Sequence, residues 1–398
     1  MDPYIDSEAL DLGHRLTKRK LDNLARADAA MQAGDVELDA LPSKVTFQTT
    51  DCCNLTCPHC QIPKHRKSMS MPEAMLDLLA ATLLPDLIEL HPTNLGEPFA
   101  WRHFRRLCGM LAEYGVVLDL TTNGTLLDRE RIEWIAPIAR DVKVSFDGAT
   151  AATFERFRLG ASFDDVCANV RALVARLRRT RSRRPVVALQ MTLMRDNVDE
   201  LPALVRLAHE LGADRVKAYH VFSFDDATRE QSLVADLQHY EQQVLPLALA
   251  VGAELGVDLQ LAEPSGGDPA GLKRRRCFLP WHETWVDVDG AVLLCHSHGG
   301  EIAGRLDDFH AAWNGALYQS VRRGLVAGEP VAACAGCGMS LDKQEEHEPV
   351  PFDPDAFIDG AEGHAPIRWS GRMRPFELAG RRIWATPTPM PRPKERRP

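Results

Sequence analysis

From residue 44 to about residue 262, short apolar segments alternate with longer segments of helical periodicity, and this alternation constrains the fold most. Parallel strands need long connections, so strands separated by helices favour a parallel sheet with right-handed crossovers. Six such units predict an α/β fold, a partial (β/α)6 barrel of the TIM type. The expected strands are 44–50, 86–91, 116–122, 142–146, 186–193 and 215–220, with a further strand at 257–262; the expected helices are 72–84, 101–114, 127–139, 163–179, 198–211 and 232–255.

Three cysteines follow the first expected strand, at Cys53, Cys57 and Cys60 in the run Asp-Cys-Cys-Asn-Leu-Thr-Cys-Pro-His-Cys. Three thiolates cannot close a tetrahedral metal site, which takes four protein ligands. They suit a [4Fe–4S] cluster that keeps one iron open to another ligand. A partial zinc site is the alternative. Cys52 falls outside the C-x3-C-x2-C spacing, so we expect it not to bind.

Four more cysteines stand near the C-terminal end, at Cys277, Cys295, Cys334 and Cys337. Four thiolates close a cluster completely, although the same residues could hold a structural zinc ion. The segment 285–294 alternates around Asp289-Gly290, which predicts a β-hairpin that brings Cys295 near Cys277. His296 and His298 follow Cys295, but four thiolates already suffice.

The C-x3-C-x2-C spacing, with Asn54-Leu55 after the first cysteine, resembles the signature of the radical S-adenosylmethionine (SAM) enzymes. The later cysteines, with Gly290 between the first two, resemble the SPASM/twitch subgroup, and no cysteine after Cys337 favours the shorter twitch form. In that family the open iron binds SAM, whose reductive cleavage gives a deoxyadenosyl radical that abstracts a substrate hydrogen. The resemblance therefore implies SAM, a radical SAM [4Fe–4S] cluster, one auxiliary [4Fe–4S] cluster and a flavodoxin or ferredoxin as electron donor.

The resemblance also implies SAM contacts at the carboxyl ends of the strands. Gly96 and Glu97 partly match the stretch that holds the SAM ammonium, with Leu95 in place of its first glycine. Asn123 either contacts the cofactor or only permits a turn. Each match has a structural alternative. Gly96-Glu97 could be a plain turn, Ser145 a cap at the end of a strand and Arg158 a charge on the protein surface. The remaining matches are His59 at the position whose backbone meets adenine, Ser145 at the ribose position and Arg158 at the SAM carboxylate.

For the reaction, we expect an oxidoreductase that dehydrogenates a small polar biosynthetic intermediate of the sugar or aminocyclitol type. The subgroup contains such dehydrogenases, sulfatase-maturing enzymes and enzymes that modify ribosomal peptides, and residues 1–43 look too short for a peptide-recognition domain. The alternatives are a peptide maturase, a radical epimerase using Cys108 or Cys167 as hydrogen donor, and a zinc-stabilised binding module. Candidate bases for the oxidation are Glu263, Lys217 and Tyr219, with His220 beside them; alternation puts Lys217 and Tyr219 on one face.

The composition of the chain limits which partners and which cellular location are expected. A net charge of −9 and a pI of about 5.9 argue against nucleic acid. No apolar run predicts a membrane span, so a cytoplasmic location is expected, where clustered cysteines bind metal more often than they form disulfides. The basic runs 176–184 and 273–276 are either surface charge or a dock for the electron donor. The expected domains are a helical extension (1–43), the radical SAM barrel (44–262), the auxiliary cluster domain (263–342) and a C-terminal extension (343–398) with a disordered tail.

Overall fold

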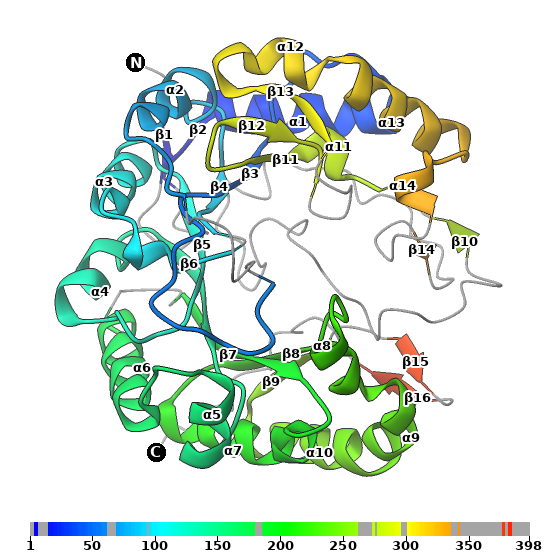
Figure 1. Cartoon of the computed structure of the whole chain (residues 1–398). Helices are drawn as coiled ribbons and strands as arrows, with labels where there is room; N and C mark the ends of the chain where they lie inside the picture. Colours follow the sequence, from blue (N-terminus) through cyan, green and yellow to red (C-terminus); the bar gives the residue numbers. More distant parts are fainter. Residues whose placement is uncertain are drawn as a thin grey trace, which may run out of the picture.

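The computed structural model describes residues 4–6, 15–61, 69–93, 95–179, 185–261, 273–274, 277–295, 301–335, 341–342, 376–378 and 381–383. One ten-stranded sheet forms its centre, in the order β13-β12-β11-β3-β4-β5-β6-β7-β8-β9. Figure 1 shows the sheet lining the inside of a C-shaped arc, with helices on the outside. This open arrangement of parallel strands and outer helices confirms the predicted α/β partial barrel.

All seven expected strands of the barrel are present, each within a few residues of its predicted limits. They are β3 (Lys44–Phe47), β4 (Glu89–His91), β5 (Val117–Thr122), β6 (Ala139–Ser145), β7 (Val186–Leu193), β8 (Arg215–His220) and β9 (Asp258–Leu261). The connecting helices are α2 (Ala74–Thr82), α3 (Phe104–Glu113), α4 (Arg129–Ile135), α5 (Ala151–Phe157), α6 (Phe163–Leu177), α7 (Leu201–Leu211) and α10 (Leu245–Leu255).

Two helical segments differ from the prediction. α5 was not predicted from the sequence, although Thr150 caps it by accepting a hydrogen bond from the Thr153 N–H. The segment before α10 is broken into α8 (Asp226–Glu230), a 3₁₀ turn at Leu233–Asp236, α9 (Leu237–His239) and a π-helical turn at Tyr240–Val244. Pro246 at the start of α10 has no N–H to donate, so a regular helix cannot run through this point without losing a hydrogen bond.

The C-terminal part adds strands to the same sheet. β11 (Glu283–Val286) pairs parallel with β3 and antiparallel with β12 (Ala291–Leu293), which confirms the predicted hairpin; Gly290 occupies the turn with φ +84°. β13 (Ile302–Arg305) completes the sheet, followed by α12 (Phe309–Trp313), α13 (Ala316–Ala327) and α14 (Ala332–Ala335). The sheet thus runs across the predicted domain limit at residues 262–263, and the four-domain division stays a prediction.

The first residues are not helical throughout. β1 (Tyr4–Asp6) pairs with β2 (Arg15–Thr17), and the single helix α1 (Lys18–Ala33) ends at Gly34, whose φ of +81° suits a glycine cap. Short pairs β10 (Lys273–Arg274) with β14 (Leu341–Asp342), and β15 (Phe376–Leu378) with β16 (Arg381–Ile383), lie outside the main sheet. The predicted disordered tail, 386–398, lies outside the described residues. Among the described helices, none combines the length and apolar character needed to cross a bilayer.

The two faces of the barrel sheet differ in polarity. One face, with residues such as Phe47 and Leu120, is buried against the helices. The other face lines the inside of the arc and carries paired charges. Glu89 is 2% exposed; the Lys44 Nζ lies 3.0 Å from its Oε1, and Arg140 pairs with its Oε2. Burial alone would raise the pKa of Glu89, but Arg140 and Lys44 lower it to about 2.

We expect Glu89→Gln to lower the free energy of unfolding by about 3 kcal/mol, because two half-buried cations lose their shared buried anion. Urea unfolding at neutral pH measures this, with the exposed Glu113→Gln as the control, expected to change by less than about 0.5 kcal/mol. The folded-state pKa is lowered, so the stabilisation is complete above pH 4.5 and is lost as the pH falls towards 2. The difference between wild type and variant should therefore shrink across that window. Equal stability at neutral pH would contradict the prediction.

Candidate functional site

The predicted cluster ligands lie on the cysteine loop (residues 51–61), which follows β3 at the carboxyl end of the parallel strands. Cys57 is 7% exposed, Cys60 is half-buried and Cys53 is exposed. The Leu55 N–H lies 3.4 Å from the Cys53 Sγ, and the Asn123 Nδ2 lies 3.7 Å from it. Burial above all raises the pKa of Cys57 to about 11; Asp147 and the neighbouring sulfurs add to this effect, and Arg158 opposes it.

These surroundings fit three thiolates bound to iron. N–H groups from Leu55 and Asn123 approach Cys53, and the Arg158 Nη1 lies 3.9 Å from the Cys57 Sγ. A bound cluster keeps such cysteines deprotonated despite their raised pKa, and N–H donors to sulfur tune its potential. Among the described residues, no group of three His, Cys, Asp or Glu side chains is arranged to hold a single metal ion. That finding is compatible with a cube, because its thiolates bind separate irons.

Gly96 brings the loop before η1 (Pro98–Ala100) against the cysteine loop, backbone to backbone. Its φ is +87°, and a Cβ there would lie 2.5 Å from the Thr50 oxygen and 2.9 Å from the Cys52 oxygen. The Glu97 N–H donates to the same Cys52 oxygen at 2.8 Å. Only glycine fits this approach, so Gly96 sets the position of the cysteine loop whatever else it contacts.

We expect Gly96→Ala to destabilise the cysteine loop by more than about 2 kcal/mol, since it combines left-handed backbone strain with a clash against main-chain atoms. The measurement is iron content after anaerobic reconstitution, which should fall, together with the midpoint of thermal unfolding. Gly256→Ala is the matched control: its φ is +71°, but no atom lies within 4 Å of the added Cβ. Full iron content in Gly96→Ala would contradict the prediction, because it would show that the cysteine loop can move and still bind its cluster.

Glu97 is buried and bound to protein groups. Its carboxylate accepts hydrogen bonds from the Thr122 Oγ1 at 2.8 Å, the Asn123 N–H at 2.7 Å and the Phe99 N–H at 3.3 Å. Burial raises the pKa of Glu97 to about 7 against the effect of these donors. Glu97 therefore joins η1 to the end of β5, and its contact with the SAM ammonium stays a prediction.

Asn123 does more than permit a turn. Its Nδ2 donates to the Asn54 Oδ1 at 2.9 Å and faces the Cys53 sulfur, while its Oδ1 accepts from the Thr125 N–H at 3.0 Å. The β5 end is thus tied to the cysteine loop by one amide side chain.

Asp147, which was not among the residues predicted from the sequence, connects two predicted site residues. The Arg158 Nε lies 2.6 Å and the His59 Nε2 3.1 Å from its Oδ2. The His59 ring also meets Phe157 edge-on, with centroids 6.1 Å apart. The His59 ring is thus occupied by Asp147 and Phe157, and only its backbone remains for the predicted contact with adenine. The available signal was the position of Asp147, directly after β6 in Ser-Phe-Asp-Gly.

The remaining candidates divide between the two faces of the strands. Ser145 ends β6 in register with Gln190 of β7, whose Nε2 lies 3.5 Å from the Tyr219 hydroxyl. Lys217 lies opposite Gln190 in the register of β7 and β8. Lys217 and Tyr219 are two residues apart in β8, so their side chains share the inner face, as predicted. His220 takes the other face, where its ring packs 5.4 Å from Tyr240 and burial lowers its pKa to about 4. Glu263 lies outside the described residues.

The two cysteines considered as hydrogen donors lie away from this site. Cys108 on α3 and Cys167 on α6 are 3% and 4% exposed within the layer between helices and sheet. Burial raises the pKa of both thiols, that of Cys167 to about 11. They pack as small apolar residues.

The predicted auxiliary ligands belong to neighbouring elements. Cys277 and Phe278 precede α11 (Leu279–His282), which packs on α13; Cys295 follows β12; Cys334 lies on α14 after α13. Burial, and to a smaller extent the Cys295 sulfur, raise the pKa of Tyr318 on α13. Cys337, His296 and His298 lie outside the described residues, so the closed four-thiolate site stays a prediction.

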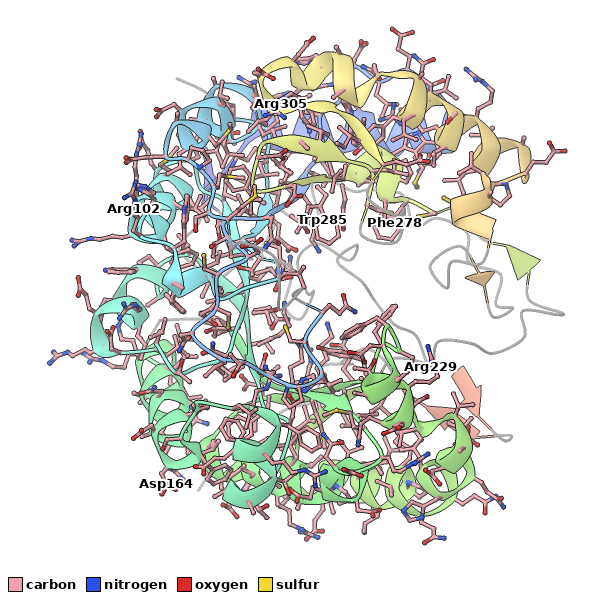
Figure 2. The ribbon with its side chains drawn as sticks, in the orientation of Figure 1. Arg102, Asp164, Arg229, Phe278, Trp285 and Arg305 are labelled. Atoms are coloured by element: carbon pink, nitrogen blue, oxygen red, sulfur yellow. The ribbon has the colours of Figure 1, made fainter. Side chains whose placement is uncertain are left out.

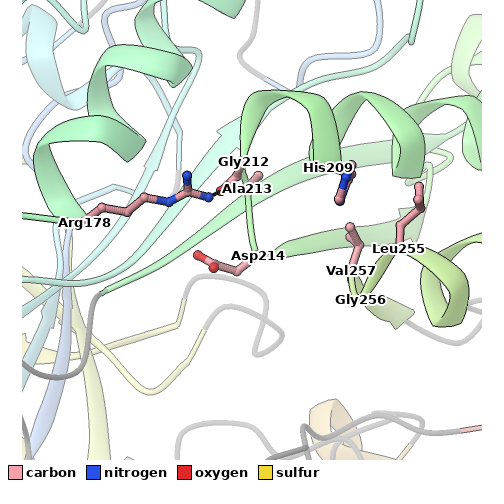
Figure 3. A pocket seen from close by; sticks show the side chains of 8 residues that line it. All are labelled: Arg178, His209, Gly212, Ala213, Asp214, Leu255, Gly256 and Val257. Carbon is pink, nitrogen blue, oxygen red and sulfur yellow. Dashed lines mark hydrogen bonds between the residues drawn. The ribbon is translucent and has the colours of Figure 1, made fainter. Parts of the chain in front are cut away.

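A surface pocket lies at the opposite end of the barrel strands. Its volume is about 340 Å³, and Arg178, Asp214 and Val257 are among its lining residues (Figure 3). Asp214 and Val257 directly precede β8 and β9, far along the strands from the cysteine loop. Arg178 belongs to the first basic run and donates to the Gly212 oxygen at 3.1 Å, while Arg176 pairs with Glu133 at 2.8 Å. Surface charge therefore explains this part of the run.

Comparisons with known proteins agree with the geometry. Residues 47–208 match the Radical SAM superfamily model. The chain is 26% identical over 270 residues to a PqqA peptide cyclase of Gluconobacter oxydans, covering 65% of this chain and 72% of that protein. A PqqA peptide cyclase of Rhodopseudomonas palustris is 25% identical over 320 residues, covering 75% and 81%. The fold resembles SuiB of Streptococcus suis bound to S-adenosylmethionine, with a TM-score of 0.58, 14% identity and coverage of 80% and 75%.

The predicted cofactors, a [4Fe–4S] cluster and SAM, are those that this superfamily uses, and the residues around the cysteine loop fit them. We conclude that residues 47–208 form a radical SAM domain and that the chain is an enzyme that carries this domain.

Proposed function

We propose that this enzyme is a maturase that modifies a ribosomally made peptide by radical SAM chemistry. The observation that carries the proposal is the similarity to PqqA peptide cyclases, which extends well beyond residues 47–208, to 65% and 75% of the chain. The sequence alone favoured a small sugar or aminocyclitol substrate. The relatives support the peptide alternative better.

Exposed apolar side chains near the site support a peptide substrate. Four of the eight large apolar side chains exposed in the described part of the chain are on segments that border the carboxyl ends of the strands. Met69 and Leu159 offer backbone oxygens to the Asp51 and Thr56 N–H groups of the cysteine loop. Phe222 and Phe224 follow β8 and are 52% and 44% exposed. A peptide with apolar side chains could cover such surface, whereas a sugar would leave it in water.

The inner side of the arc adds aromatic surface. Figure 2 shows Trp285 and Phe278 pointing from the upper arm towards the inside of the arc. Trp285 lies on β11, and Phe278 directly follows the predicted cluster ligand Cys277. We propose that a substrate peptide lies between this arm and the cysteine loop.

In this proposal Cys53, Cys57 and Cys60 hold the radical SAM cluster, and Cys277, Cys295, Cys334 and Cys337 hold an auxiliary [4Fe–4S] cluster. When bound, these clusters and SAM supply the radical that removes a substrate hydrogen and an acceptor for the second electron. Gly96, Glu97, Asn123, Ser145, Arg158 and the His59 backbone surround the SAM position.

Lys217 is the proposed proton acceptor. Burial lowers the pKa of its ammonium, and no carboxylate of the described residues lies within salt-bridge distance of it. Tyr219 is a weaker candidate, since burial raises the pKa of its hydroxyl. A lysine that loses its proton more readily suits a general base near neutral pH.

The test uses the full chain, reconstituted and reduced under anaerobic conditions, with SAM and synthetic peptides encoded beside its gene. Mass spectrometry should find a peptide that loses hydrogen as deoxyadenosine accumulates, and deuterium from the labelled peptide should appear in deoxyadenosine. A panel of deuterated sugars and aminocyclitols is run in parallel. Label transfer from that panel, with no change in any peptide, would refute the maturase proposal.

A further inference from the structure

Asp147 gathers four separate segments of the radical SAM domain. Its side chain is fully buried and lies next to His59 of the cysteine loop and Arg158 after α5. Its Oδ1 accepts the Thr192 N–H of β7 at 2.7 Å. Its backbone oxygen accepts the Asn197 Nδ2 at 3.0 Å. A carboxylate is rarely buried so completely unless its partners repay the loss of water.

The partners of Asp147 keep it ionised. Burial raises its pKa, but Arg158 and His59 outweigh burial and hold it well below the usual range for an aspartate. Asp147 and Arg158 therefore stay oppositely charged, and the Arg158 Nε lies 2.6 Å from the Asp147 Oδ2 in an ion pair. The side of the guanidinium remote from this contact bears the Nη1, which lies 3.9 Å from the Cys57 sulfur.

We propose that Asp147 is a positioning residue: it holds Arg158 in the direction required to bind the SAM carboxylate. The inference rests on the proposed function only in taking the cysteine loop and Arg158 as the SAM site. It is independent of whether the substrate is a peptide. Without Asp147, Arg158 keeps its charge but loses the contact that fixes its direction, so SAM binding weakens while the cysteines remain in place.

The main test is Asp147→Asn in the reconstituted full chain. Dissociation constants for SAM come from calorimetry, and iron content and the paramagnetic resonance spectrum of the reduced cluster are recorded with and without SAM. We expect iron content equal to wild type, a SAM dissociation constant raised about 10- to 100-fold, and a smaller spectral change on adding SAM. The control is Asp164→Asn, an exposed aspartate on the first turn of α6 (Figure 2), which should match wild type.

A double-variant comparison separates positioning from a general structural role. If Asp147 acts through Arg158, then Asp147→Asn should change SAM affinity little in an Arg158→Gln background. Should Asp147→Asn fail to fold, Arg158→Lys tests the same link from the other side. Lysine keeps the positive charge but cannot contact Asp147 and the SAM carboxylate together as a guanidinium does, so the same 10- to 100-fold weakening is expected.

Three results would overturn the proposal: wild-type SAM affinity in a folded Asp147→Asn or Arg158→Lys variant, an equal effect of Asp147→Asn with and without Arg158, or loss of iron from Asp147→Asn. Absence of SAM binding in the wild-type protein would instead count against the proposed function itself. The two failures are therefore distinguishable.

Discussion

Cys57→Ala is expected to abolish reductive cleavage of SAM, with deoxyadenosine falling to the level of the enzyme-free control. Cys57 is the most buried of the three loop cysteines, and the Arg158 Nη1 approaches its sulfur. Removing it leaves two thiolates, too few to hold a cube. The loss should exceed the roughly 100-fold that follows removal of a hydrogen-bond partner of a metal ligand. Iron should fall from about eight to about four per chain.

Cys52→Ala provides a control from the same loop. Its sulfur lies 3.5 Å from the Ser70 hydroxyl, beside the isolated bridge between Thr50 and Ser70. We expect this variant to keep full iron content and SAM cleavage. Deoxyadenosine formation by Cys57→Ala at the wild-type rate, or an equal loss in both variants, would show that the three ligands are wrongly assigned.

Cys334→Ala is expected to have a different effect: SAM cleavage continues, but substrate turnover falls to background. The proposed auxiliary cluster accepts the second electron, so its loss should uncouple the first step from product formation. The measurement is the ratio of deoxyadenosine to modified product, which should rise by at least about tenfold, with iron again falling to about four per chain. Cys52→Ala should keep the wild-type ratio. A Cys334→Ala variant with normal turnover and unchanged iron would remove Cys334 from the ligand set.

The barrel could be predicted because each of its strands is marked by a short apolar segment in the sequence. Val186–Leu193 is a largely apolar and β-branched segment, interrupted only by Gln190 and Thr192, and it forms β7 within the same limits. The hairpin around Gly290 was equally visible, since a turn with positive φ favours glycine. What the pattern could not predict was the partner of β11. Pairing with β3 depends on packing across the whole chain, and no local signal carries that information.

The site followed the same division. The cysteine spacing identified the loop, because these three ligands lie within eight residues of one another and need no tertiary information to be recognised as one set. The role of Asp147 and the hydrogen bond from the Asn123 N–H to Glu97 could not be predicted from the sequence, because both depend on which groups meet in the folded chain. Conversely, strand alternation placed Lys217 and Tyr219 together correctly, because a period of two needs no tertiary information. The same alternation put His220 on the opposite face.

The pairing of β11 with β3 has a consequence for biosynthesis. Residues 44–47 form β3, and their partners on one side are residues 283–286, which emerge from the ribosome long after the cysteine loop. Until then β3 is an edge strand, and contacts across such sequence separation form slowly. Before this pairing, the cysteine loop follows a strand that is paired only with β4, so an iron–sulfur cluster inserted at that stage would bind to a less constrained loop. A chain that ends before residue 283 is therefore expected to load iron poorly, because its cysteine loop would follow a strand that is paired on one side only.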